Sequence, residues 1–158
     1  MKLIFTWNEI LVYKSTDLIM SLPASCKVRH ELNRQRKPDQ IVYTIPGEGK
    51  AEAYYPRQFP GGIFSITEVI YTDDKTYAPV KIKTTATRKV FTWELDNEKE
   101  YWYPSGRIQE DTSYWLHYTE SITTLGCIRI HSKPDALALA KIVERELKTG
   151  EKIYLEVL

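Results

Sequence analysis

The chain has 158 residues, of which 22 are lysine or arginine and 21 are aspartate or glutamate, so its formal net charge is +1. A chain of this length predicts one domain over residues 1–158 with one hydrophobic core, and the balanced charge gives no indication of general binding to nucleic acid or anionic lipid. The 11 tyrosines and 4 tryptophans favour a β-rich fold, because aromatic residues are enriched in strands.

The first half of the chain predicts strands separated by polar turns. Residues 2–25 are interpreted as a pair of strands around a turn at residues 14–17, and residues 46–49 carry a proline and glycine turn signal. The charged segment 26–40 is interpreted as a solvated loop, with a basic site for an acidic ligand as the alternative. Further strands are predicted at residues 41–45, 63–71 and 80–87.

The second half predicts more strands and then a helix. Strands are predicted at residues 90–95, 101–103, 114–118, 126–130 and 152–158, with turns at 96–98 and 104–107. Ser132 is the expected N-cap of the helix, and Gly150 suits the left-handed position beyond its end. The apolar stripe of the helix is expected to consist of Leu139, Ile142, Val143 and Leu147. The fold class predicted is mainly β with one principal helix.

His117 and Cys127 are the candidate catalytic pair. A cysteine is a strong nucleophile only as thiolate, so it needs a cation, a base or local dipoles that lower its pKa. A loop between the two predicted strands can bring the imidazole beside the sulfur. Gly126 would let a substrate carbonyl approach, and the N–H groups of Gly126 and Cys127 would hold an oxyanion. The alternative is a small buried cysteine and a structural histidine.

The motif around Cys127 resembles the signature of the L,D-transpeptidase (YkuD-like) catalytic domain family. In that signature Ser or Thr, a variable residue, Gly and Cys are followed by Ile or Val and Arg, as they are here from Thr124 to Arg129. Residues 116–118 are similar to the upstream histidine strand of the family. The likeness extends to the opening hairpin at 7–25, the proline and glycine segment at 60–66, the helix at 135–139 and the closing strand at 149–153. The resemblance implies a β-sandwich-like catalytic domain.

The resemblance also implies an activity. Cys127 would attack the carbonyl of the third residue of a peptidoglycan stem peptide and form a thioester, with His117 as the base. The backbone carbonyl that follows the histidine would orient the imidazole. Arg129 would hold a substrate carboxylate or brace the motif. The candidate substrate-binding residues are Tyr114, Tyr118, Thr124 and Arg129.

Three alternatives are open from the sequence. The acyl group can pass to an amine, as in a transpeptidase, or to water, as in an L,D-carboxypeptidase or endopeptidase. The interval from His117 to Cys127 is shorter than is usual in the family, which counts against cross-linking relative to hydrolysis. A non-catalytic peptidoglycan-binding or peptide-binding module would use Trp102, Tyr103, Tyr114 and Trp115 as its platform. An unrelated papain-like peptidase is disfavoured, because papain-like enzymes carry Cys before His.

Location, partners and cofactors follow from the same residues. No signal-peptide core opens the chain, so we expect no Sec-type export, whereas the implied substrate lies in the cell wall. Delivery as a secreted toxin, release by a phage or prior removal of a signal peptide would reconcile the absent signal with a substrate in the cell wall. The expected partners are peptidoglycan stem peptides, without nucleic acid or a membrane span, and no oligomeric state is predicted. Because Cys26 and Cys127 are the only cysteines, we expect no disulfide framework and no cysteine-based metal site, with a single disulfide between the two as the alternative. The sequence gives no support for a metal or redox cofactor.

Overall fold

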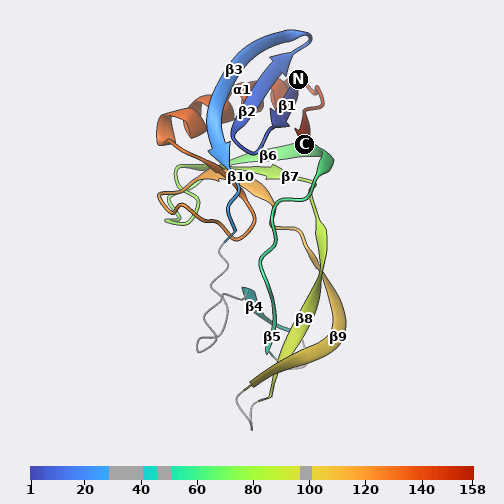
Figure 1. Cartoon of the computed structure of the whole chain (residues 1–158). Coiled ribbons are helices and arrows are strands. Elements are labelled where there is room, and N and C mark those ends of the chain that lie inside the picture. The colour runs from blue at the N-terminus through green and yellow to red at the C-terminus, as the bar shows by residue number, and fades with distance from the viewer. Residues whose placement is uncertain (29–40, 46–50, 97–100) are drawn as a thin grey trace.

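The structure is a computed structural model that describes residues 1–28, 41–45, 51–96 and 101–158, with the backbone alone described at 41–44. Strands dominate these residues, and one helix lies against them (Figure 1). The predicted mainly β fold with one principal helix is confirmed for this part of the chain. The predicted loop at 26–40 and the turns at 46–49 and 96–98 lie wholly or partly outside it.

Most of the described strands close into a barrel, in the order β1, β12, β6, β7, β10, β11, β3 and β2. The expected sandwich-like arrangement therefore takes the form of a closed barrel. Their bounds are β1 Lys2–Phe5, β2 Glu9–Lys14, β3 Asp17–Ser25, β6 Gly62–Tyr71, β7 Val80–Thr84, β10 Trp115–Tyr118, β11 Ile128–Ile130 and β12 Tyr154–Val157.

The prediction of two strands in residues 2–25 is wrong, because the structure has three there. A tight turn between β1 and β2 divides the first predicted strand. In that turn the Thr6 N–H donates to the Glu9 carbonyl at 3.0 Å, and Trp7 has a φ of +76°. A positive φ is rare for a bulky residue, and periodicity alone does not reveal it.

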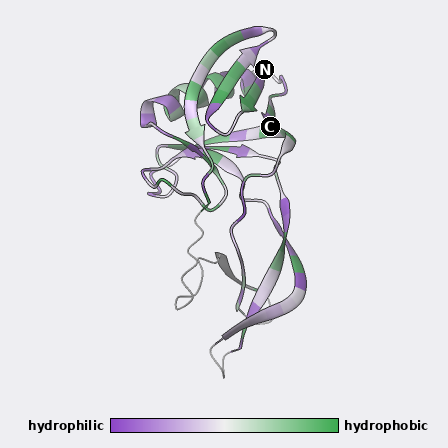
Figure 2. Cartoon of the chain, viewed as in Figure 1, coloured by the Kyte–Doolittle hydropathy of each residue, from purple (hydrophilic) through white to green (hydrophobic). Residues whose placement is uncertain are grey.

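The barrel interior is apolar because side chains alternate along each strand. In β7, Val80 and Ile82 are buried while Lys81 and Lys83 are half-exposed. Leu116 of β10 lies opposite Ile128 of β11, and both are fully buried. Figure 2 shows the hydrophobic stretches of β1, β2 and β3 and the mixed hydropathy of the helix.

The helix α1, Lys133–Lys148, covers part of the barrel and contacts β6, β7, β10 and β11. Ser132 is its N-cap as predicted, and its hydroxyl accepts the Asp135 N–H at 3.2 Å. Gly150 has a φ of +79°, which confirms the predicted left-handed position after the helix. The buried face consists of Ala136, Leu139, Ala140 and Val143, whereas Ile142 and Leu147 of the predicted stripe lie partly buried on its flank.

A separate four-stranded sheet extends away from the barrel as an arm (Figure 1). The predicted turn at 104–107 is wrong, because β9 runs through it. Trp93 pairs with Pro104 and Phe91 with Ile108, so residues 105–107 form a bulge opposite one residue of β8. The order is β4 Ile41–Thr44, β5 Ala51–Tyr54, β8 Arg88–Asp96 and β9 Tyr101–Asp111.

The barrel positions the predicted catalytic residues. Strand β10 pairs in parallel with β11 and antiparallel with β7, which places His117 opposite Arg129 on one side and Lys81 on the other. Cys127 directly precedes β11. Within the described ranges, no helix has the length and hydropathy needed to cross a membrane.

Candidate active site

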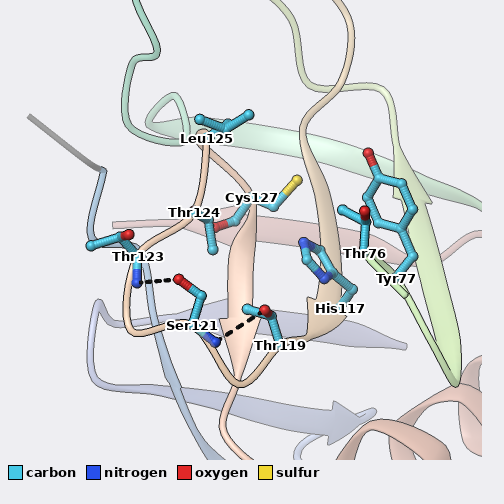
Figure 3. A pocket seen from close by; sticks show the side chains of 9 residues that line it. All are labelled: Thr76, Tyr77, His117, Thr119, Ser121, Thr123, Thr124, Leu125 and Cys127. Carbon is cyan, nitrogen blue, oxygen red and sulfur yellow. Dashed lines mark hydrogen bonds between the residues drawn. The ribbon is translucent and has the colours of Figure 1, made fainter. Parts of the chain in front are cut away.

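A cavity of about 390 Å³ lies between β10, the loop of residues 119–125 and the loop between β6 and β7. Figure 3 shows the imidazole of His117 and the sulfur of Cys127 directed into this space, with the ring of Tyr77 beside His117. The two predicted catalytic residues therefore share one pocket. The lining residues are Thr76, Tyr77, His117, Thr119, Ser121, Thr123, Thr124, Leu125 and Cys127.

His117 is held in one tautomer by the backbone. Its Nδ1 lies 2.9 Å from the Tyr118 carbonyl oxygen. Because a carbonyl can only accept, Nδ1 carries the proton and Nε2 keeps its lone pair. This is the carbonyl contact that the resemblance implied. Burial lowers the pKa of His117, the bond to Tyr118 opposes that effect, and the charge of Lys81 lowers the pKa further. His117 is therefore neutral at neutral pH and suited to accept a proton.

Cys127 is a protonated thiol in this arrangement. Its side chain is buried and donates to the Ser113 carbonyl at 3.3 Å. Burial raises the pKa of Cys127 to about 12, and the Trp115 N–H and the Lys81 charge only partly oppose this. Desolvation therefore outweighs the nearby dipoles in setting this pKa. The thiol thus requires a base at the moment of attack.

Gly126 is the residue that the turn before Cys127 demands. Its φ is +124°, and a Cβ at this position would lie 2.6 Å from the Arg57 carbonyl oxygen and 2.9 Å from a ring carbon of Tyr114. A side chain would therefore clash with backbone as well as adopt a strained φ. The Gly126 N–H donates to the Thr124 hydroxyl at 3.2 Å, so it is not the free oxyanion donor that we expected.

Thr124 braces this turn with its hydroxyl. The Thr124 Oγ1 donates to the Cys127 carbonyl at 2.7 Å while it accepts the Gly126 N–H. The Thr124 N–H donates to the Lys27 carbonyl at 2.9 Å, which ties the turn to the end of β3. Thr124 does line the pocket, but its hydroxyl is engaged within the turn and not directed at a ligand.

Cys26 supports the same turn from behind. Its thiol donates to the Gly126 carbonyl at 3.4 Å and accepts the Phe59 N–H at the same distance. Both cysteines are free and buried. Burial raises the pKa of Cys26, although the Phe59 N–H, Thr124 and Arg88 act against this. Cys26 is therefore a contact between three segments of the chain, a role that the sequence alone did not indicate.

One comparison with known proteins identifies the family of the chain. A family model described as the L,D-transpeptidase catalytic domain matches residues 29–154. The chain belongs to the L,D-transpeptidase catalytic domain family. No curated protein and no solved structure matches the chain. The matched range includes His117 and Cys127, whereas the opening strands β1 to β3 precede it.

Three residues expected to bind substrate lie elsewhere in this L,D-transpeptidase domain. Tyr114 is 1% exposed and packs edge-on against Phe59 at 5.5 Å between ring centroids, so it is a core residue. Tyr118 alternates with His117 along β10 and lines a neighbouring pocket beside Lys133. The Arg129 Nε donates to the Thr119 carbonyl at 2.9 Å, which favours the bracing role, and its side chain lines a separate pocket.

The aromatic platform of the alternative binding module is not formed. Trp102 and Tyr103 lie on β9 of the arm, whereas Tyr114 lies in the core. Trp115 lies on β10, with the Lys81 Nζ 4.6 Å from its ring centroid. Four residues spread over the arm, the core and the barrel cannot present one flat surface to a ligand.

One wall of the pocket was not predicted from the sequence. Thr76 and Tyr77 come from the loop between β6 and β7, and the Tyr77 ring meets the His117 ring edge-on at 5.1 Å between centroids. The Lys81 Nζ lies 4.6 Å from the Tyr77 ring centroid. No local pattern marks this loop, because only closure of the barrel brings it to His117. In the described part of the chain, no three His, Cys, Asp or Glu residues gather as a metal site.

Proposed function

We propose that this L,D-transpeptidase-family domain is a cysteine enzyme that acts on peptidoglycan stem peptides through a thioester. The observation that carries the proposal is the shared pocket of Cys127 and His117, in which the Tyr118 carbonyl leaves Nε2 of the imidazole as the acceptor. A nucleophile beside a base that a third group orients is the arrangement that acyl transfer requires. Membership of the family supplies the class of substrate.

The first half of the reaction forms the acyl-enzyme. The His117 Nε2 takes the thiol proton as the Cys127 sulfur attacks the carbonyl carbon of the third stem residue. The Cys127 N–H, and not that of Gly126, stabilises the oxyanion. The C–N bond to the terminal D-amino acid then breaks, and the imidazolium gives its proton to the departing amine. A thioester and a free D-amino acid result.

The second half releases the acyl group. An amine or a water molecule loses a proton to His117 as it attacks the thioester carbonyl, and the sulfur leaves and is reprotonated. An amine acceptor gives a cross-linked product, and water gives a shortened stem. The thiol can remain protonated between turnovers, because its pKa is raised to about 12 and deprotonation is needed only during attack.

Product masses test the proposal. Purified protein incubated with muropeptides that carry tetrapeptide stems should release the terminal D-amino acid, and should join the remaining acyl group to the amine of a second stem if amines are accepted. Cys127→Ala should give neither product, whereas Ser121→Ala, which changes a pocket-lining hydroxyl, should retain turnover. Unchanged muropeptides with the folded wild-type protein would contradict the proposal. Release of the terminal D-amino acid without cross-linking would support the proposal and identify the enzyme as a carboxypeptidase.

A further inference from the structure

A second pocket lies beside Arg129 and His131. Arg129 is the half-buried residue of β11, whereas its neighbours Ile128 and Ile130 are buried in the core. The pocket has a volume of about 430 Å³, and its lining includes Arg129 and His131 but neither Cys127 nor His117. It is therefore distinct from the candidate active site.

Three basic side chains meet in this pocket. Arg129 of β11 pairs with Ser25 of β3, and the His131 Nε2 lies 2.9 Å from the Ser25 hydroxyl. Lys27 follows Ser25 by two positions and lines the same pocket. The bond from the Arg129 Nε to the Thr119 carbonyl fixes the guanidinium, which leaves its two Nη groups as further donors. Asn8 and Gln58 also line the pocket and add amide donors.

The described lining of this pocket carries positive charge without a carboxylate to balance it. No aspartate or glutamate is among the described residues that line it. Burial and then the charges of Arg129 and Lys27 lower the pKa of His131, so the field of both cations reaches the imidazole. Like charges held together in this way repel one another, and a bound anion would relieve that repulsion.

We propose that this pocket binds a phosphate-bearing ligand, whose oxygens are held by Lys27, Arg129 and His131. A planar carboxylate presents two oxygens, which one guanidinium can satisfy. A phosphate monoester presents three terminal oxygens in a tetrahedral arrangement and carries more charge, which matches the two cations Lys27 and Arg129 together with the imidazole of His131. A basic site within residues 26–40 was the alternative considered from the sequence, and Lys27 is the basic residue of that segment that the structure describes. In the proposed site its partners are Arg129 of β11 and His131, which follows β11.

Calorimetric titration of the whole protein with inorganic phosphate, at constant ionic strength and near pH 6.5, tests the proposal. We expect saturable binding that the double variant Lys27→Gln with His131→Gln weakens by at least about tenfold, because charged hydrogen bonds are lost. Lys141→Gln removes an exposed charge of α1 outside the pocket and should bind as the wild type does. Absence of saturable binding, or equal loss in the Lys141 variant, would overturn the proposal.

The source of the phosphate and its position need two further measurements. Vesicles of phosphatidic acid, whose headgroup is a phosphate monoester, with phosphatidylcholine as control, distinguish a lipid headgroup from a soluble phosphate, and either source is consistent with the site. The titratable groups that line the pocket with His131 are Cys26, Lys27 and Arg129. A phosphate held among them should raise the pKa of His131 in NMR titrations, because an anion favours the imidazolium. An unchanged pKa at saturation would place the phosphate elsewhere.

This inference does not depend on the proposed catalytic function. Cys127 lies outside the pocket, so Cys127→Ala should bind phosphate with the affinity of the wild type. Loss of turnover with retained phosphate binding would support both proposals. If the protein binds phosphate but never turns over muropeptides, the phosphate site is supported and only the proposed enzymatic function is contradicted.

Discussion

Replacement of His117 by glutamine should lower kcat by about 10²–10⁴-fold, which is the range for loss of a general base. Glutamine can still donate to the Tyr118 carbonyl that His117 contacts, so the change removes the base with little effect on the fold. Turnover of muropeptides, with circular dichroism to confirm folding, measures the effect. Retention of more than about a tenth of wild-type kcat would show that another group takes the thiol proton.

The same variant should change the pH profile. The neutral imidazole is the active form, and burial lowers its pKa below the ordinary value of 6.5. Wild-type kcat/KM should therefore fall with decreasing pH only as the medium passes below that ordinary value, since protonation of His117 removes the base. His117→Gln should lack this acid limb, and an unchanged limb in the variant would assign it to a different group.

Alkylation of Cys127 by iodoacetamide should be slow at neutral pH and steeply dependent on pH. A thiol with a pKa of about 12 has only about one part in 10⁵ as thiolate at pH 7. Its rate should rise about tenfold for each pH unit between pH 7 and pH 9, because the thiolate is the reactive form. Labelling followed by peptide mapping measures Cys127 separately from Cys26, and free N-acetylcysteine provides the reference.

A plateau of the labelling rate near neutral pH would contradict this picture, because it would indicate a preformed thiolate and imidazolium pair. Slow labelling is consistent with catalysis here. In the proposed mechanism the buried thiol gives its proton to the neutral His117, which lines the same pocket, as a substrate carbonyl provides the electrophile. The protein is thus expected to resist small alkylating agents more than it resists an acylating substrate.

Much of the site followed from local sequence. The Gly126 turn, the helix cap at Ser132 and the strand that carries His117 all depend on residues within a few positions of one another. Backbone strain and capping are local effects, so the residue types indicate them. The pairing of His117 with Cys127 came from the residues and the resemblance together, and the family match supports the domain that contains them.

The remaining parts required the tertiary structure. Alternation predicts that Tyr118 points away from His117, but not which pocket it enters. The burial of Tyr114 and the approach of Tyr77 depend on which strands become neighbours when the barrel closes. The pKa of Cys127 depends on desolvation by the whole fold, which no motif records. Residues 104–107 have turn chemistry, yet Pro104 pairs with Trp93 of β8 and residues 105–107 form a bulge in β9.

The most direct measurement is the intact mass of the protein after incubation with an acylating β-lactam of the carbapenem class, followed by mapping of the modified peptide. We expect one adduct on Cys127, its absence in Cys127→Ala, and its slower formation in His117→Gln. Wild-type protein that remains unmodified, or that carries the adduct on Cys26, would contradict the assignment of Cys127 as the nucleophile.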